Sequence, residues 1–230
     1  MNSLSIIIPT YNEVKSIEYV LNVWHTHLKK VKIKHEFVIC EDGSTDGTKE
    51  LVLKLAKKYP IINESSIKRR GYGGGVLAGI YASRFDYLLS IDSDGQSMPD
   101  SFGSLWKNRH KAEILVGTRS PRMDSAKRKI YSFLFSLLHK ALFPSGIKDP
   151  HAYVLAKKEN YLKLLPYLSY MNEGFWWGFI AAAIKLKMSI DQYPIKHYLR
   201  YDGATRVYKI TKMPSIIFRN ILGLIKLRFS

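Results

Sequence analysis

The chain has 230 residues, of which 46% are hydrophobic and 24% charged, a composition that predicts a globular domain large enough to bury a core. Lysine and arginine number 36 against 19 acidic residues, so the net charge of +17 indicates an anionic partner such as a phosphorylated molecule, a nucleic acid or an acidic membrane surface. The single cysteine, Cys40, excludes a disulfide framework and fits a reducing compartment. We find no signal-peptide pattern and no apolar run of about 18 residues, so we expect no membrane-spanning helix.

Alternating strands and helices are predicted in the first half of the chain. Short apolar runs predict strands at residues 4–8, 36–40, 61–62, 86–91 and 113–117. Apolar stripes at helical spacing predict helices over residues 13–29, 46–58 and 71–83, with Thr45 or Asp46 capping the second. This alternation is typical of a parallel, doubly wound sheet, in which ligands bind beyond the carboxyl ends of the strands.

Polar clusters follow three of these strands, at residues 9–13, 41–44 and 92–96. The last cluster places Asp92 and Asp94 one residue apart, directly after an apolar strand. Two carboxylates this close repel each other unless a positive charge lies between them. Mg²⁺ or Mn²⁺ would supply that charge and keep coordination positions open for substrate phosphates. An ordinary turn also explains this cluster when it is taken alone, so the prediction depends on all three clusters meeting in one crevice.

A glycine-rich run offers a competing interpretation. The spacing Gly73-x-Gly75-x-x-Ala78 is similar to the dinucleotide-binding fingerprint, but a basic loop at residues 68–70 precedes it instead of a strand. The next strand also ends in two aspartates that are spaced for a metal. We therefore predict that Gly75 and Gly79 serve close packing of a helix on the sheet.

An ordered series of motifs resembles the family 2 inverting glycosyltransferases. The motifs are Ile8-Pro9-Thr10-Tyr11-Asn12-Glu13, Glu41-Asp42-Gly43-Ser44-Thr45-Asp46-Gly47-Thr48, Asp92-Ser93-Asp94-Gly95-Gln96 with Pro99, and Val116-Gly117-Thr118-Arg119. Within that family, Arg128 with Ser132, Asp149, and Arg200-x-x-Gly203-x-Thr205-Arg206 are similar to polyprenyl-phosphate sugar transferases of the dolichol-phosphate mannose synthase type. The resemblance covers residues 4–210. It implies a GT-A domain at 1–210, Rossmann-like with a mostly parallel sheet flanked by helices. The residue pattern after this domain predicts a basic amphipathic helical tail at 211–230.

The resemblance also implies roles for single residues. Pro9, Tyr11 and Glu13 would hold the base and ribose of a nucleotide sugar, and Asp42 would accept the ring N–H of uracil or guanine. The metal on the diphosphate would be held by Asp92 and Asp94 with Gln96 alongside, and Ser93 lies between the two acids. Arg119, Arg200 and Arg206 would neutralise phosphate oxygens. Arg206 stands where relatives usually carry lysine, and the residues after Asp149 depart from the family pattern.

The acceptor is expected to be a polyprenyl phosphate whose phosphate group is bound by Arg128. A hydroxyl acceptor needs a base to remove its proton, whereas a phosphate monoester is already anionic. A soluble transferase acting on a glycan hydroxyl, with Asp149 or Glu173 as the base, remains the alternative. A nucleic-acid-binding module is suggested by the net charge alone, and we find no nucleic-acid motif of the usual kinds.

Two basic amphipathic segments favour a membrane-borne acceptor. Residues 126–143 carry a broad apolar face at helical spacing, namely Ile130, Phe133, Leu134, Leu137, Leu138 and Ala141, with a polar strip of Ser132, Ser136, His139 and Lys140. In the tail, Ile217, Phe218, Ile221, Leu222, Leu224 and Ile225 oppose Ser215, Arg219, Asn220, Gly223 and Lys226. Such helices lie in the interface of anionic membranes, unless both faces pack on the domain. We expect a peripheral enzyme on the cytoplasmic face.

Overall fold

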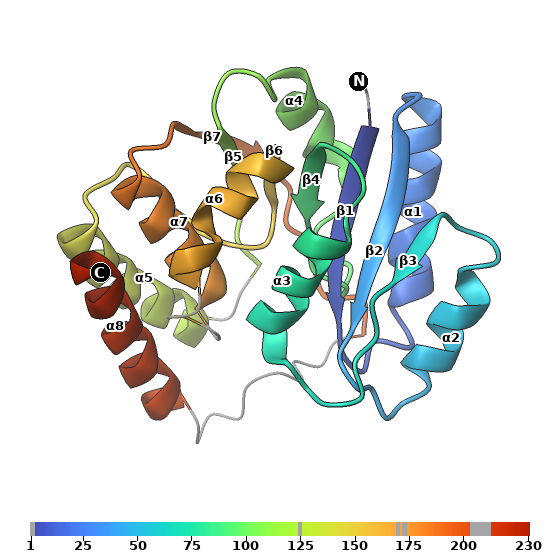
Figure 1. The fold of residues 1–230 in the computed structure, drawn as a ribbon, viewed down its shortest axis with the longest axis horizontal. Coiled ribbons are helices and arrows are strands. Elements are labelled where there is room, and N and C mark those ends of the chain that lie inside the picture. The colour runs from blue at the N-terminus through green and yellow to red at the C-terminus, as the bar shows by residue number, and fades with distance from the viewer. Residues whose placement is uncertain (1–2, 124–125, 169–170, 172–173, 203–212) are drawn as a thin grey trace.

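The computed structural model describes residues 3–123, 126–168, 171, 174–202 and 213–230, and the side chains of 126–128, 213 and 214 lie outside this description. Seven strands of the described chain form one mixed sheet (Figure 1). In spatial order they are β3 (Ile61–Asn63), β2 (Lys34–Glu41), β1 (Ser3–Thr10), β4 (Tyr87–Ser90), β6 (Val154–Lys157), β5 (Ile114–Arg119) and β7 (Ile190–Ile195). β6 runs antiparallel to both of its neighbours, and all other pairs are parallel.

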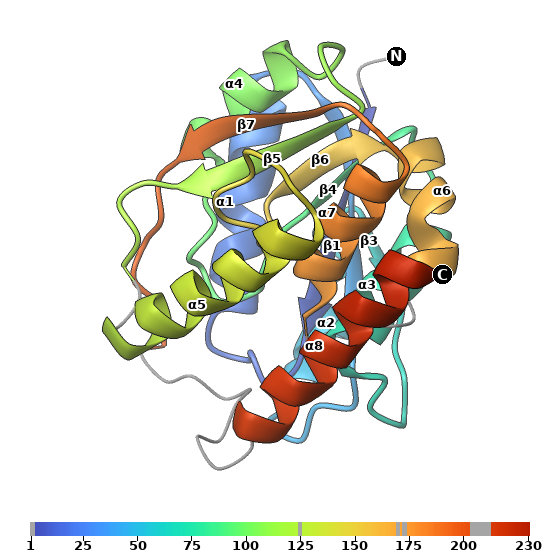
Figure 2. The same cartoon turned by 90° about the vertical axis from the view of Figure 1, so that its left-hand side faces the viewer.

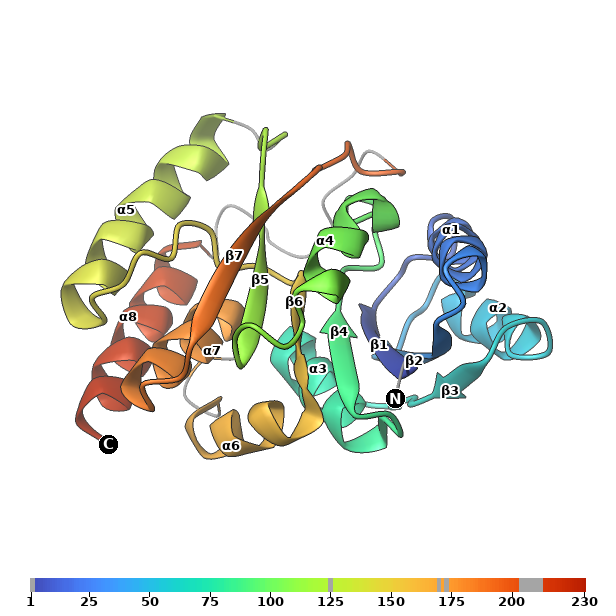
Figure 3. The ribbon, with the colours of Figure 1, turned by 90° about the horizontal axis from the view of Figure 1, so that it is seen from above.

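Helices cover both faces of the sheet (Figure 3). One face carries α1 (Ile17–Lys30), α2 (Thr48–Leu55), the 3-10 turn η1 (Pro99–Ser101) and α4 (Phe102–Lys107). The other carries α3 (Gly71–Ala82), α6 (Lys158–Leu168) and α7 (Phe175–Lys185), with α5 (Ala126–Leu142) and α8 (Met213–Phe229) beyond them. Alternate residues of β1 enter the two cores, since Ile7 packs with α3 whereas Ile6 and Ile8 pack with α1. This two-layered burial confirms the predicted α/β architecture.

The packing role predicted for the glycines is confirmed at Gly79. A Cβ atom there would lie 2.4 Å from Cγ2 of Ile7 and 2.7 Å from Sγ of Cys40, so α3 can approach the sheet only without a side chain. At Gly75 the nearest atoms would be 3.7 Å away, an ordinary contact, so closeness alone does not demand glycine there. Burial also raises the pKa of the Cys40 thiol to about 12, which keeps it a structural, unreactive side chain.

Several predicted boundaries differ from the observed ones. α1 begins at Ile17 rather than residue 13, because residues 11–16 form turns, with Asn12 at a φ of 55°. The residue at the N-cap of α2 is Gly47 (φ 91°), not Thr45 or Asp46. The Asp46 carboxylate still accepts the Thr48 N–H at 3.1 Å, so the predicted chemistry is present one residue earlier. The expected mostly parallel sheet is confirmed, and β6 is its antiparallel strand.

The outward face of α5 is apolar. Ile130, Phe133, Leu134 and Leu137 are each more than half exposed, at 51–61% of their accessible surface. Polar His139 instead faces the domain, where its Nε2 lies 3.1 Å from the Trp177 carbonyl. A water-facing helix normally shows the opposite arrangement. The alternative that the apolar face of this segment packs on the domain is therefore wrong.

The C-terminal helix α8 has two apolar faces. One packs Ile216, Leu224 and Leu227 against the domain, and this face also buries Asn220 and Gly223, which we had assigned to a polar face. The other face exposes Phe218, Leu222, Ile225 and Phe229. α5 and α8 lie together at one end of the molecule (Figure 2). Across the described ranges, every helix is too short or too polar to cross a bilayer.

Candidate active site

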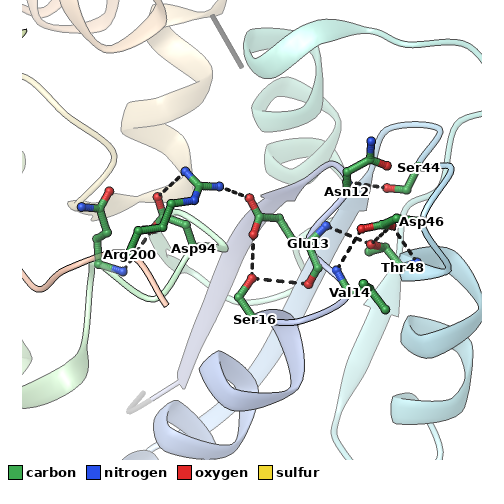
Figure 4. A network of polar contacts seen from close by, with 10 residues as sticks. Asn12, Glu13, Val14, Ser16, Ser44, Asp46, Thr48, Asp94 and Arg200 are labelled. Atoms are coloured by element: carbon green, nitrogen blue, oxygen red, sulfur yellow. Dashed lines mark hydrogen bonds and ion pairs between the residues drawn. The ribbon is translucent and has the colours of Figure 1, made fainter. Parts of the chain in front are cut away.

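Glu13 lies at the carboxyl end of β1 and is fixed from several directions (Figure 4). Its backbone N–H donates to Oγ1 of Thr48 at 2.9 Å, and its Oε2 accepts a hydrogen bond from Ser16 at 2.6 Å. Its Oε1 accepts a hydrogen bond from the guanidinium of Arg200. The glutamate is 6% exposed, so its charge is compensated mainly by this arginine.

The same arginine contacts the end of β4. Nη1 of Arg200 donates to Oδ2 of Asp94 at 3.2 Å, and Oδ1 of Asp94 accepts the Gln96 N–H at 3.0 Å. Arg200 therefore joins the ends of two neighbouring parallel strands, and the predicted convergence of Glu13 and Asp94 in one crevice is observed (Figure 4). One guanidinium supplies the positive charge that two nearby buried carboxylates require.

Residues 197–202 lie across the Asp92–Gln96 loop. The Tyr198 N–H donates to the Gln96 carbonyl at 3.1 Å, and the Gln96 side-chain amide donates to the Tyr198 carbonyl at 3.2 Å. Tyr201 stacks on Tyr19 of α1 with ring centroids 4.6 Å apart, and Lys15 pairs with Asp202 at 3.0 Å. The side-chain amide nitrogen of Gln96 is thus hydrogen-bonded to residues 197–202.

An open cavity of about 490 Å³ lies between residues 197–201, α1 and the loop after β4. Its lining includes Tyr19, Met98 and Tyr201, and its one carboxylate is Asp100. Among the described residues that line it, none is lysine or arginine. The described lining of this cavity therefore offers no fixed positive charge to a diphosphate, whereas the crevice of Glu13 and Asp94 contains Arg200.

Asp92 is held by a residue that sequence reasoning missed. Its Oδ1 accepts a hydrogen bond from the Tyr72 hydroxyl at 2.9 Å, and that hydroxyl oxygen accepts Nε1–H of Trp176 at 2.9 Å. Ser93, between the two aspartates, is buried. Nothing in the local sequence indicates this contact, because Tyr72 and Trp176 are 104 residues apart.

The residues predicted for the base lie around the start of α3. Both carboxylate oxygens of Asp42 accept backbone hydrogen bonds, from Arg70 at 2.7 Å and from Gly71 at 3.0 Å. The guanidinium of Arg69 lies 3.7 Å from the ring centroid of Tyr11. Pro9 is buried in β1. Asp42 and Tyr11 therefore meet the same loop, and Asp42 also stabilises the helix N-terminus.

Asp149 forms a buried ion pair with Arg119. Nε and Nη2 of Arg119 each donate to one carboxylate oxygen at 2.7 Å, and Nη1 of Arg122 lies 3.5 Å from Oδ1. Burial alone would raise the pKa of Asp149, but the hydrogen bonds and charge of Arg119, with His151 and Arg122, lower it to about 2. With both oxygens hydrogen-bonded to Arg119 and its pKa lowered, the Asp149 carboxylate is a weak base.

Arg122 was not predicted, although it follows Arg119 by three residues in the sequence. Its Nη2 donates to Ser132 of α5 at 3.3 Å. Arg122, just beyond the end of β5, therefore adjoins the helix whose outer face is apolar. Arg206, Glu173 and the side chain of Arg128 lie outside the described residues. In the described part of the chain, no group of three or more His, Cys, Asp or Glu could hold a metal ion.

The architecture is that of the GT-A glycosyltransferases. Glucosyl-3-phosphoglycerate synthase from Mycobacterium tuberculosis, solved with Mn²⁺, UDP and phosphoglyceric acid, superposes with a TM-score of 0.71 over 99% of this chain and 78% of that one, at 17% identity. Mannosyl-3-phosphoglycerate synthase from Rubrobacter xylanophilus has a TM-score of 0.69 over 97% of this chain and 73% of that one, at 12% identity. At these identities the likeness concerns the fold alone.

The chain belongs to glycosyl transferase family 2, whose family model matches residues 5–176. It is 30% identical to a dolichyl-phosphate beta-glucosyltransferase of Dictyostelium discoideum, over 98% of this chain and 77% of that protein. The enzyme of that description from Saccharomyces cerevisiae is 29% identical, over 87% of this chain and 68% of its own length. An undecaprenyl-phosphate 4-deoxy-4-formamido-L-arabinose transferase of Pseudomonas fluorescens is 31% identical, over 60% of this chain and 41% of its own length. The resemblance predicted from the motifs is confirmed.

Proposed function

We propose that this glycosyltransferase moves a sugar from a nucleotide sugar to a polyprenyl phosphate at a membrane surface, with inversion at the sugar C1. The observation that carries the proposal is the outward apolar face of α5, which Ser132 joins to Arg122, just beyond the end of β5. A lipid phosphate requires an apolar surface and a cationic site next to each other. The names of the relatives above support the same acceptor class.

The donor would lie in the crevice of Glu13 and Asp94. We assign the base and ribose to Pro9, Tyr11, Glu13 and Asp42, as the resemblance implies. Tyr11 lies beside basic Arg69, and the first turn of α3 provides backbone N–H groups near Asp42. Glu13 and Asp94 are both bonded to Arg200, so this arginine can turn one of its donors toward a diphosphate oxygen while it keeps a carboxylate partner.

The paired aspartates suit a divalent ion. Asp92 and Asp94 offer hard oxygen ligands at the end of β4, and Mg²⁺ or Mn²⁺ often binds through only one or two carboxylates plus substrate phosphates. This fits the absence of a larger acidic cluster among the described residues. When bound, the ion would stabilise the charge of the departing diphosphate. Ser93 and Gln96 shape the loop, and Gln96 would lie alongside the ion through its side-chain amide oxygen.

The acceptor phosphate needs no base. One of its oxygens would attack C1 while the bond from C1 to the donor diphosphate breaks, and the nucleoside diphosphate leaves without proton removal. The lowered pKa of Asp149, about 2, weighs against this residue as the base for a glycan hydroxyl; Glu173, the other candidate base, lies outside the described residues. Arg119 and Arg122 are assigned to the acceptor side with Arg128, and Arg206 stays a proposed phosphate ligand.

The decisive assay offers purified protein, Mg²⁺ or Mn²⁺, and labelled UDP-glucose, GDP-mannose or other nucleotide sugars together with a polyprenyl phosphate in vesicles. Label entering the organic phase as an alkali-stable or acid-labile lipid phosphate supports the proposal. Transfer only to a soluble glycan would replace the acceptor assignment. A shift of nucleic acid at physiological salt, without any donor turnover, would favour the nucleic-acid-binding alternative.

We propose that α5 and α8 together hold the protein on the cytoplasmic face of an anionic membrane. The segment from residue 125 to 148 and the chain after Asp202 contain no acidic residue. Exposed apolar side chains on both helices would enter the interface, and each nearby lysine or arginine adds about 1 kcal/mol on an anionic surface. α8 also packs Leu224 and Leu227 into the core, so the tail at 211–230 is better tested by point substitutions than by deletion.

Replacing Phe133, Leu134 and Leu137 together by serine is expected to weaken binding to anionic vesicles by at least about tenfold. Burying one such side chain contributes roughly 1.5–3 kcal/mol, and about 1.4 kcal/mol corresponds to a factor of ten. The matched control is Leu53→Ser on α2, which is also about half exposed (52%) but lies on the opposite face. Vesicle co-sedimentation measures both variants. Equal binding of the triple variant and the wild type would contradict the membrane assignment.

A further inference from the structure

A directed hydrogen-bond chain connects the interior of the α7 face to Asp92. Nε1–H of Trp176 donates to the Tyr72 hydroxyl oxygen at 2.9 Å, and the Tyr72 O–H donates to Oδ1 of Asp92 at 2.9 Å. The direction is fixed by chemistry, because an indole N–H can only donate and an ionised carboxylate can only accept. The single proton of the tyrosine must then point at Asp92.

The inner end of this chain is rigid. Trp176 is 6% exposed and meets Phe175 and Phe179 edge to face, with ring centroids 5.0 Å and 5.4 Å apart. α7 is almost entirely buried on the same face of the sheet as α3, where it packs beside α6 and α8 (Figure 1). Motion of the Tyr72 hydroxyl would therefore break its bond from a fixed donor.

The outer end of the chain lies at the first turn of α3. Gly71 donates its N–H to Asp42, and the next residue, Tyr72, donates its hydroxyl to Asp92. One helical turn thus contacts carboxylates from the ends of both β2 and β4. The start of α3 therefore fixes how the two carboxylates stand relative to each other.

We propose that Tyr72 and Trp176 are positioning residues for Asp92, an inference that rests on the proposed function. Asp92 and Asp94 repel each other when both are ionised, so an untethered Asp92 side chain would turn away from its neighbour. A hydrogen bond to a charged acceptor is roughly twice as strong as a neutral one. The tyrosine hydroxyl keeps the Asp92 carboxylate in one orientation, on the side from which nucleotide diphosphate and divalent ion arrive. Trp176 acts only through Tyr72.

The test is a double-mutant cycle of Tyr72→Phe and Trp176→Phe, read by calorimetric binding of Mn²⁺ with UDP and, separately, with GDP. Tyr72→Phe keeps the ring and removes only the hydroxyl, and we expect about tenfold weaker binding with a matching loss of kcat/KM. Trp176→Phe should weaken binding two- to fivefold in the wild type, and should have no further effect in the Tyr72→Phe background. A purely structural role of the tryptophan ring would give equal losses in both backgrounds.

Asp92→Asn and the unfolding midpoint of each variant complete the experiment. Wild-type binding by Tyr72→Phe, or equal losses from Trp176→Phe in both backgrounds, overturns the positioning role. If Asp92→Asn binds as the wild type does, Asp92 has no function to be positioned for, and the inference fails. A wild type that binds Mn²⁺ with a nucleoside diphosphate but glycosylates no lipid phosphate overturns the proposed acceptor alone. A wild type that binds neither nucleotide overturns both.

Discussion

Replacing Asp94 by asparagine is expected to reduce sugar transfer about a thousandfold. The proposed ion depends on the negative charge of this side chain, and charge stabilisation by a bound metal contributes several kcal/mol, which corresponds to roughly three powers of ten in rate. The loss should fall on kcat/KM for every donor, because the diphosphate is common to all of them. Transfer of labelled sugar to polyprenyl phosphate measures it.

The fold should survive this change. An asparagine oxygen can replace Oδ1 of Asp94 as acceptor of the Gln96 N–H, and Arg200 keeps its bond to Glu13. Asp86→Asn is the matched control, since Asp86 is exposed and precedes the opposite end of β4. It should transfer sugar at the wild-type rate. Wild-type turnover by Asp94→Asn, with an unchanged melting temperature in both variants, would contradict the role assigned to Asp94.

The first half of the fold could be predicted because its signals are local. β1 and β4 are apolar runs that are completely or almost completely buried, and each ends where polar residues begin. The packing role of Gly79 could be predicted as well, because only a helix without a side chain at this position can pack on Ile7 and Cys40. Motif order then indicated the family, which the comparison with the family model confirms.

The second half gave weaker local signals. β6 has four residues and runs directly into α6, so the pattern has no turn residues to separate them. Its antiparallel direction depends on where β5 and β4 already lie, which is a property of the whole sheet. α7 is apolar on nearly all sides, and such a segment carries no periodicity from which a buried face could be identified.

In the candidate site, too, some contacts could be predicted from the sequence and others could not. That Glu13 and Asp94 would meet could be predicted, because parallel strands bring their carboxyl ends to one edge of the sheet. The bridge that Arg200 forms between them could not be predicted, since 187 residues separate this arginine from Glu13. Tyr72 and Trp176 have aromatic side chains that usually indicate core packing, so only the three-dimensional contacts reveal their hydrogen bonds to the crevice.

Charge compensation is the common principle of the site. Arg200 is shared by Glu13 and Asp94 and offsets part of their negative charge, while Arg119 and Arg122 both pair with Asp149. With a net charge of +17, the chain has many more basic than acidic side chains, yet these arginines are mostly buried and paired with carboxylates. Such pairing fixes the direction of each guanidinium. A bound phosphate would then meet donors that are already oriented, which reduces the entropy lost on binding.

Removing the Asp149 side chain is expected to destabilise the protein by about 3–5 kcal/mol, because it leaves a buried arginine charge without its partner. The side chains of Arg119 and Asp149 are 10% and 7% exposed, so solvent screens the pair little. Urea unfolding of Asp149→Ala at pH 7 measures the loss. Arg122→Ala is the control: this arginine lies 3.5 Å from the carboxylate and is 22% exposed, and its loss should cost less than about 1 kcal/mol.

The pH dependence of stability gives a second measure of the same pair. The pKa of Asp149 falls from 3.8 to about 2 on folding, so the unfolded chain takes up the proton first as the pH is lowered. The stability that this carboxylate contributes is complete above about pH 4 and disappears as the pH falls toward 2. Asp149→Ala should lack that part of the acid-induced loss, and an identical acid slope in variant and wild type would contradict the low pKa.

An apolar pair separates the structural part of this interaction from its proposed chemistry. Arg119→Met combined with Asp149→Leu has a similar volume and no buried charge, so most of the stability lost in Asp149→Ala should return. Sugar transfer should stay at least about a hundredfold below the wild type, because the guanidinium assigned to the acceptor phosphate is absent. If transfer returns together with stability, Arg119 serves only to hold β5, and the acceptor phosphate must be bound by other cations.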